Sequence, residues 1–389
     1  MIATWLDNPS HRAWLERNFA DILQFALASP LIEGGFAYLG ADGTPVPGRK
    51  PQLMFTARSL YTASLGVMHG VPGAGELAEH ALASLDGLYA DQRHGGWLSE
   101  PGTVTRKATY DHVQVGLGAA TAVSAGIDRA KPLLAQVISI IDERLWDAST
   151  QTLRESFAEN WSDSENYRGA NANMHGIEAF IAIGKATQDP RWHERSLAVA
   201  DRLINRHARA RNWLLPEHYT ANWEELLDYN ADEPNHPFRP YGATFGHSLE
   251  WARFLLELER SSQVNAPWLV EAAVGLTRRA LDDGWALDGR PGLVYTVDWN
   301  GTPVSVSRLH WPICEGIQAS AALIRVTGDA HWEGWYRRLW DHAARYFIDE
   351  RGTWINELGE DLREGGLIWP GRPDVYHCGG ACITPLDWT

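Results

Sequence analysis

The sequence predicts an all-α protein, an (α/α)6 barrel with short β-hairpins at one rim, and three observations lead to this fold class. Helical segments with small residues on one face alternate along the chain with bulkier, more charged helical segments. A turn-rich piece follows several of the charged segments, and the whole unit recurs about every sixty residues. Six such units, each unable to bury its apolar face alone, are most stable when they close into a ring.

The two kinds of helix define the expected inner and outer layers. Small faces permit close contact between helices, so we expect inner helices at residues 113–125, 176–185, 248–258 and 316–326. The more charged segments are typical of helices exposed on one side, and they cover residues 76–89, 192–207, 268–281 and 332–347.

The turn-rich pieces have an Asp or Gly turn followed by a short extended run, which predicts hairpins at one rim and no parallel sheet. They lie at residues 91–97, 147–153, 288–293 and 349–354. Polar landmark residues recur on or at the starts of the small-faced helices, 54 to 72 positions apart. They are Arg58, His112, His175, His247, His310 and His377. Open arrays of helix pairs usually have shorter repeats, near 34 residues, so closure is preferred. No linker divides the chain, and residues 1–389 are expected to form one catalytic domain.

Composition excludes several classes of function. The net charge of −15 argues against nucleic acid or an anionic membrane as partner, and it favours a neutral ligand. No secretory signal and no apolar stretch of about 18 residues is found, so a cytoplasmic protein is expected. Three cysteines favour reduced thiols over a disulfide framework. The 19 tryptophans fit either core packing or the stacking of sugar rings.

Polar residues recur near the starts of the small-faced segments, where apolar packing would be expected. One end of every inner helix points to the same mouth of a closed barrel, so these residues converge on one pocket. A lone histidine is more simply structural, but the six-fold recurrence favours a functional role for His175, His247 and His377. Imidazoles exchange protons near neutral pH, and Glu250, three residues after His247, is suitably placed to tune one.

Motifs for metals and cofactors are absent from the sequence. It contains no His-Glu-x-x-His run, no Cys-x-x-Cys pair, no dinucleotide-binding glycine fingerprint and no Walker phosphate loop. Cys378 and Cys382 lie four apart, a spacing explained most simply by packing. We therefore expect neither a metal nor another cofactor.

Several motifs resemble those of the N-acylglucosamine 2-epimerase superfamily, which contains 2-epimerases, D-mannose isomerases and sulfoquinovose isomerases on an (α/α)6 barrel. The resemblance covers nearly the whole chain and is nearest to the mannose and sulfoquinovose isomerase branch. It rests on the Arg58 segment and on residues 168–175, 246–251, 311–315 and 373–377.

The resemblance implies that His247 and His377 are the acid–base pair. It also implies a sugar site formed by Arg58, Tyr110, Asn171, His175, Arg239, Glu250, Trp311 and Glu315. The expected reaction is aldose–ketose isomerisation through an enediol, with D-mannose and D-fructose as the favoured pair. His377 would move the proton between C2 and C1, His247 would open the ring, and Arg58 would stabilise the enediolate.

Four alternatives remain open from the sequence. A sugar 2-epimerase would use the same histidines, and Arg58 with Arg239 would suit a sulfoquinovose isomerase. An inverting glycoside hydrolase needs two carboxyl groups about 6.5–9.5 Å apart, for which Asp111 and Glu315 are candidates. A non-catalytic carbohydrate-binding barrel would explain the aromatic residues alone. Residues 223–239 are the expected lid, and exposed aromatic helices are compatible with a homodimer.

Overall fold

Helices dominate the computed structural model, which describes residues 4–103, 105–261 and 266–388. The α-helices of these ranges are α1 (Pro9–Ala26), α2 (Leu53–Met68), α3 (Ala74–Asp86), α4 (Thr109–Ser124), α5 (Lys131–Ile140), α6 (Ala170–Thr187), α7 (Arg191–Ala200), α8 (Phe245–Ser261), α9 (Trp268–Leu281), α10 (His310–Thr327), α11 (Ala330–Tyr346) and α12 (Tyr376–Asp387). Short π-helical turns, η3 (Ile141–Leu145) and η4 (Asp201–Ala208), continue α5 and α7.

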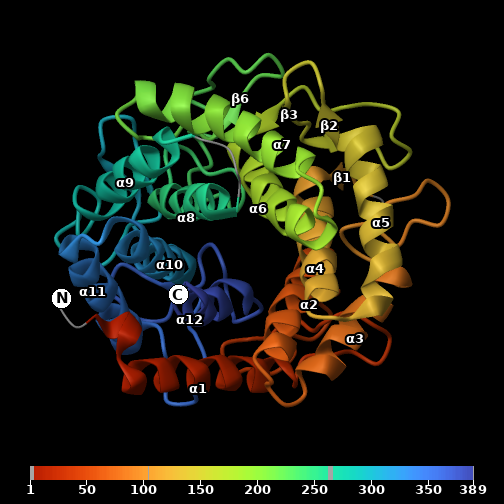
Figure 1. Cartoon of the computed structure of the whole chain (residues 1–389), viewed down its shortest axis with the longest axis horizontal. Coiled ribbons are helices and arrows are strands. Elements are labelled where there is room, and N and C mark those ends of the chain that lie inside the picture. Colours follow the sequence, from red (N-terminus) through yellow and green to blue (C-terminus); the bar gives the residue numbers. More distant parts are fainter. Residues whose placement is uncertain (1–3, 104, 262–265, 389) are drawn as a thin grey trace.

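The even-numbered helices form a closed inner ring. Each of them contacts the next one along the chain, and α12 returns to contact α2. The odd-numbered helices form an outer ring in which α3, α5, α7, α9 and α11 pack on the inner helix that precedes them, while α1 packs on α12 (Figure 1). The predicted (α/α)6 barrel is confirmed, and the first and last helices close it.

Small residues place the inner helices close together. A Cβ atom on Gly118 of α4 would lie only 2.7 Å from the carbonyl oxygen of Ala57 in α2, so the two backbones approach more closely than a larger residue would allow. Almost every residue of α4 is buried, because it faces the barrel interior on one side and the outer helices on the other. Outer helices such as α11 keep one charged, exposed side.

Strand pairs lie where the inner helices begin. The pairs are β1 (Lys107–Ala108) with β4 (Ser156–Phe157), β2 (Trp146–Asp147) with β3 (Thr152–Leu153), β5 (Arg168–Gly169) with β6 (His218–Tyr219), β7 (Thr296–Val297) with β8 (Pro303–Ser305), and β9 (Arg308–Leu309) with β10 (Glu357–Leu358), all antiparallel. β2–β3 is the hairpin at the predicted piece 147–153, and a single antiparallel bridge closes each of the other three predicted pieces: Ala90 with Trp97, Trp285 with Leu293 and Ile348 with Trp354. β7–β8 is a local hairpin that was not predicted. In the other three pairs, the strand before α4, α6 or α10 pairs with a strand from a later repeat, which ties successive repeats together.

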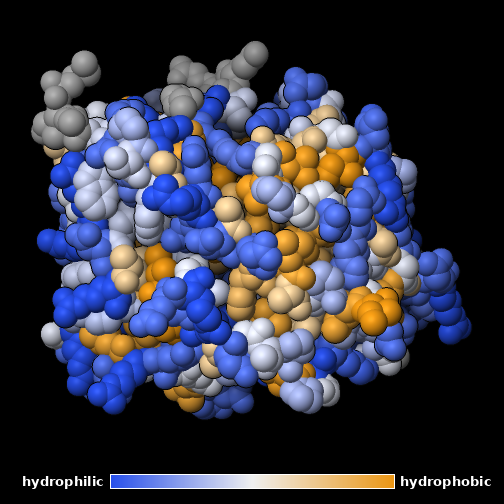
Figure 2. Space-filling view, turned by 90° about the horizontal axis from the view of Figure 1, so that it is seen from below, coloured by the Kyte–Doolittle hydropathy of each residue, from blue (hydrophilic) through white to orange (hydrophobic). Residues whose placement is uncertain are grey.

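The helical predictions were accurate in position and short at their starts. Residues 268–281 coincide with α9, whereas α4, α6, α8 and α10 each begin three to six residues before the predicted inner segments. No helix of the described chain combines the length and apolar character that crossing a bilayer requires. Figure 2 shows one side of the barrel, where hydrophilic residues predominate and apolar residues gather in patches between them.

Candidate active site

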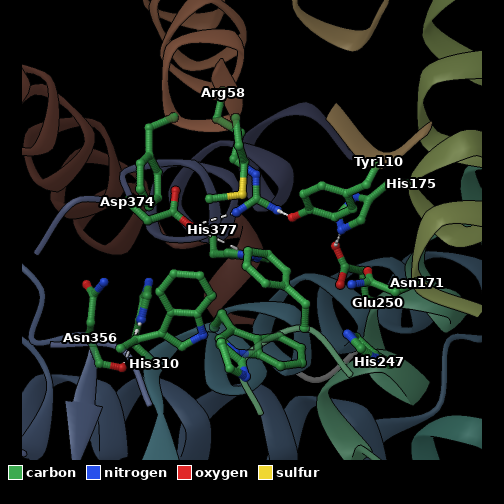
Figure 3. A pocket seen from close by; sticks show the side chains of 16 residues that line it. Arg58, Tyr110, Asn171, His175, His247, Glu250, His310, Asn356, Asp374 and His377 are labelled. Carbon is green, nitrogen blue, oxygen red and sulfur yellow. Dashed lines mark hydrogen bonds and ion pairs between the residues drawn. The ribbon is translucent and has the colours of Figure 1, made fainter. Parts of the chain in front are cut away.

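A cavity with about 550 Å³ of empty space lies at the N-terminal ends of the inner helices. All six inner helices contribute side chains to it, and the remaining walls come from the segments that precede β10 and α12 and from the loop before α8 (Figure 3). Its lining residues are Met54, Phe55, Arg58, Tyr110, Asn171, His175, Pro237, Phe238, His247, Glu250, His310, Trp311, Asn356, Trp369, Asp374 and His377.

The structure brings eight of the ten sequence-predicted site residues to this cavity, which are Arg58, Tyr110, Asn171, His175, His247, Glu250, Trp311 and His377. The other two lie elsewhere. Glu315 is completely buried behind His377, which it contacts. Arg239 lines an adjacent cavity. His112, one of the repeat landmarks, is buried in α4 between the backbones of Ala108 and Trp97 and does not line the cavity.

Three imidazoles of the cavity share one arrangement. Each has its Nδ1 atom within hydrogen-bonding distance of a buried carboxylate, so Nδ1 carries a hydrogen and Nε2 is left for a ligand. The pairs are His175 with Glu178 (3.2 Å), His247 with Glu217 (2.9 Å) and His377 with Glu315 (2.9 Å).

The carboxylate behind His377 is held on every side. Glu315 accepts hydrogen bonds from Arg253 Nε at 3.0 Å and from Gln318 Nε2 at 2.8 Å, so a guanidinium partly balances its negative charge. Burial and the nearby charge of Arg58 lower the pKa of His377 well below its usual range. His377 is therefore a neutral imidazole at pH 7, which is the protonation state of a general base.

Arg58 supplies positive charge to the cavity. Its guanidinium donates to Asp374 Oδ2 at 2.8 Å and to the Tyr110 hydroxyl at 2.9 Å (Figure 3). These contacts fix the plane of the group, while its Nε atom has no partner among the described residues. Positive charge held in this way is suited to an oxygen that becomes negative during a reaction.

Glu250 is a second carboxyl group with an unusual environment. Burial, followed by the proximity of Glu315, raises its pKa well above the usual range, which favours its protonated form. Its Oε1 atom lies 3.8 Å from His175 Nε2 and has no hydrogen-bond partner in the described chain. Burial also lowers the pKa of His175 to about 4, so its imidazole is neutral at pH 7 and able to bind a hydroxyl.

Free polar atoms gather around the cavity although buried polar groups are normally paired. They have no partner within the ranges that the structure describes, and they belong to both predicted and unpredicted residues: Arg58 Nε, Asn171 Oδ1, Glu250 Oε1, His310 Nε2 and Asn356 Oδ1. Donors and acceptors arranged around one space match a ligand with several hydroxyl groups.

Aromatic rings form two walls of the cavity. Trp311 packs against His247 on one side and His377 on the other, with ring centroids 5.1 Å and 5.7 Å away. Phe238 lies at the mouth, with its ring 5.7 Å from Tyr110 and 5.1 Å from Trp369. Phe238 belongs to the segment expected to act as a lid, and it lines the cavity.

Arg239 lies in an adjacent cavity with about 1630 Å³ of empty space, which shares Met54, Tyr110, Asn171 and Phe238 with the first. Its guanidinium donates to Glu165 at 2.9 Å and to Glu155 at 3.3 Å, and it stacks on Tyr167 at 4.3 Å. Two carboxylates thus balance its charge, and its observed contacts anchor the loop.

Sequence reasoning missed lining residues that lie in loops, above all Asn356, Asp374, Phe238 and Trp369. It also missed Glu217, which precedes β6 and contacts His247. Loop residues follow no helical periodicity, so their convergence had no signal in the spacing. Asp374 and His310 differ from the others because both lie in motifs noted from the sequence, so these two could have been included in the predicted site.

Among the described residues, two groups of side chains are close enough to hold a metal ion. Within each group, one ligand atom from every residue lies within 4.8 Å of the others, and the groups are His175 with Glu178 and Glu250, and Glu250 with Glu315 and His377. Arg253 contacts Glu178 and Glu315 and supplies positive charge at this position. The expectation that no metal is needed stays a prediction.

A ring of six helix pairs with imidazoles and free polar atoms around one cavity defines an (α/α)6-barrel protein with an acid–base site. The chain belongs to the N-acylglucosamine 2-epimerase (GlcNAc 2-epimerase) family, whose model matches residues 34–381. The family resemblance seen in the sequence is thereby confirmed.

The chain matches relatives of similar length along nearly their whole sequence. The chain is 43% identical to a D-mannose isomerase from Thermobifida fusca, over 98% of this chain and 96% of that protein. It is 42% identical to a D-mannose isomerase from Pseudomonas cannabina pv. alisalensis, over 99% of this chain and 94% of that protein. A crystal structure of a D-mannose isomerase superimposes with a TM-score of 0.90 at 26% identity, covering 96% of this chain and 97% of the other.

Proposed function

We propose that this chain is an aldose–ketose isomerase that interconverts D-mannose and D-fructose without a metal or other cofactor, and that residues 1–389 form its catalytic domain. The single observation that carries the proposal is the neutral imidazole of His377, bound through Nδ1 to Glu315, in the same cavity as His247. The names of the full-length relatives support mannose as the sugar.

The reaction follows from the positions of the two imidazoles. His247 transfers protons at the ring oxygen and O1 to open the pyranose. Nε2 of His377 then takes the proton from C2; the C2–H electron pair forms the C1–C2 double bond, and the C1 carbonyl pair moves to O1. His247 takes the proton of O2 and gives it to O1, passing through the enediol. The O2 electron pair then forms the C2 carbonyl of the ketose, while the C1–C2 pair takes the proton back from His377 at C1. Each positioned acid or base contributes about 10²–10⁴-fold to the rate.

Charged and neutral donors serve the oxygens of the enediol. Arg58 is fixed by Asp374 and Tyr110, so it offers positive charge to negative character on O1 or O2. The protonated carboxyl group of Glu250 donates a hydrogen bond without adding negative charge beside the enediolate. Free acceptors such as Asn356 Oδ1 bind the hydroxyls that do not react.

The environment of the two arginines favours a neutral sugar over a sulfonated one. Arg239 is paired with Glu155 and Glu165, and Arg58 is paired with Asp374. A sulfonate would have to compete with these carboxylates for the positive charge of the arginines. Sulfoquinovose is therefore a poorer substrate than mannose under this proposal.

The carboxyl groups considered for a glycoside hydrolase do not face one another across the site. Glu315 is fully buried and accepts from Arg253, Gln318 and His377. Asp111 lines the adjacent cavity and accepts a hydrogen bond from Ser99. Neither is placed to protonate a leaving group or to activate water beside a bound sugar.

The test is a product assay with mannose, glucose, fructose and sulfoquinovose as separate substrates, with and without EDTA. We expect fructose from mannose, the reverse reaction from fructose, and unchanged rates after chelation. Glucose as the first product from mannose would identify a 2-epimerase instead, and faster turnover of sulfoquinovose would contradict the proposed substrate. Loss of activity with EDTA, restored by a divalent cation, would contradict the metal-free chemistry.

A further inference from the structure

Glu217 is a buried carboxylate at the edge of the site, with only 4% of its surface exposed. It immediately precedes β6, and its backbone carbonyl accepts a hydrogen bond from the amide of Ala170, the first residue of α6. The adjacent pairing of Gly169 with His218 holds the same stretch. The backbone of Glu217 is thus fixed relative to α6.

The side chain of Glu217 reaches α8. Its Oε1 atom lies 2.9 Å from Nδ1 of His247, and the two residues are thirty positions apart in the sequence. Trp311 also packs against the imidazole of His247, with the two ring centroids 5.1 Å apart. One contact sets the rotation of the imidazole ring and the other limits its displacement.

The two imidazole–carboxylate pairs of the proposed mechanism differ in charge. Glu315, behind His377, is paired with Arg253 at 3.0 Å, although this guanidinium also pairs with Glu178 and Glu257, so the charge of Glu315 is partly compensated. Within the described ranges, Glu217 forms an ion pair with His247 and with no lysine or arginine. An uncompensated carboxylate stabilises an imidazolium, whereas a compensated one mainly orients a neutral ring.

We propose that Glu217 is the positioning residue for His247, an inference that rests on the proposed isomerase function. Glu217 holds the hydrogen of His247 on Nδ1, so that Nε2 faces the sugar oxygens. It also stabilises the imidazolium that forms when His247 takes a proton from a sugar hydroxyl. The two histidines thereby have different tasks: His377 exchanges protons with carbon and His247 with oxygen.

The kinetic test compares Glu217→Gln, Glu217→Asp and Glu225→Gln. Gln keeps the size of the side chain, but its amide can either donate or accept, so it neither fixes the tautomer nor balances an imidazolium. We expect kcat for mannose to fall by about 10- to 100-fold, with KM within about threefold of wild type. Asp retains the charge and is expected to recover part of the lost kcat.

The matched control uses another histidine–glutamate pair. Glu225 contacts His207 Nδ1 at 2.8 Å away from the cavity, so Glu225→Gln should leave kcat and KM unchanged. A purely structural role of Glu217 would lower stability or raise KM without a selective loss of kcat. That outcome, or full activity in Glu217→Gln, overturns the inference.

A spectroscopic test separates this inference from the proposed function. In protein labelled with 15N-histidine, the ring signals of His247 are those that disappear in His247→Gln. We expect Nδ1 to carry the hydrogen in wild type and the tautomers to be mixed in Glu217→Gln. Identical ring shifts in the two proteins overturn the inference. Correct shifts in a protein that does not isomerise mannose would keep the Glu217–His247 pairing and reject the isomerase proposal.

Discussion

The indole of Trp311 and the imidazole of His377 lie with their ring centroids 5.7 Å apart and their planes inclined by 36°. Trp311 makes a similar contact with His247, at 5.1 Å and 34°. One indole therefore sets the positions of both imidazoles. Gly246 of α8 leaves the space that this indole occupies. A Cβ atom at this position would lie 2.9 Å from Pro312 Cγ and closer still to the six-membered ring of Trp311.

Gly246→Ala should displace Trp311 and with it both imidazoles. Overpacking of this kind costs about 1–3 kcal/mol of stability, and we expect kcat/KM to fall at least about tenfold. Gly334 in the outer helix α11 has open space where its Cβ would lie, so Gly334→Ala is the matched control. It should stabilise the protein by about 0.5–1 kcal/mol with unchanged kinetics. Wild-type kinetics in a folded Gly246→Ala variant would show that Trp311 does not position the imidazoles.

His377→Asn tests the carbon base. Asn retains a donor toward Glu315 but has no basic nitrogen, so exchange of the C2 proton of mannose with solvent should stop. Isomerisation should fall by about 10²–10⁴-fold or more. Sugar binding, measured by calorimetry, should remain within about tenfold. Deuterium incorporation from D2O at the wild-type rate would defeat the assignment of His377.

Phe238→Ala tests the cover of the cavity. Phe238 contacts Tyr110 and Trp369 across the mouth, and each aromatic contact contributes about 0.5–1.5 kcal/mol. We expect KM for mannose to rise about five- to tenfold, with kcat within about twofold. Leu367→Ala removes a more exposed apolar side chain, 69% accessible against 38%, and should change neither constant. An unchanged KM in Phe238→Ala would mean that the ring does not retain the sugar.

The ring of helices could be predicted because its cause is local and repeated. Residues 268–281 alternate apolar and charged positions with helical period, and the structure places α9 over those residues. The predicted apolar segments began after the true starts of α4 and α6, since Tyr110 and Asn171 are polar residues in the first turn and break the apolar pattern. They do so because they face the cavity.

The site was predictable only where its residues lie on that repeat. His175, His247 and His377 recur in phase with the inner helices, and the closed ring brings them together. Glu217 and Asn356 come from loops, whose paths depend on pairing between distant strands. The sequence also cannot show compensation of charge: Arg239 looked free until Glu155 and Glu165 were found beside it.

Asp111 gives a prediction about stability and pH. It is buried, and burial raises its pKa from 3.8 to about 6, although Ser99 donates a hydrogen bond to it. The folded state therefore binds a proton more tightly than the unfolded state. Its contribution to stability is present at low pH and is lost as the pH rises through about 6.

Asp111→Asn removes this titration while keeping an oxygen that accepts from Ser99. From pH 5 to pH 8, wild type should lose about 1.4 kcal/mol more stability than the variant, because about one pKa unit of the shift lies above pH 5. Urea unfolding of both proteins at the two pH values measures the difference. The same substitution at Asp341, which is exposed on α11, should leave the difference near zero. A variant whose free energy of unfolding parallels that of wild type at both pH values would mean that Asp111 is hydrated in the folded protein, because only water around the carboxylate removes the cost of ionising it.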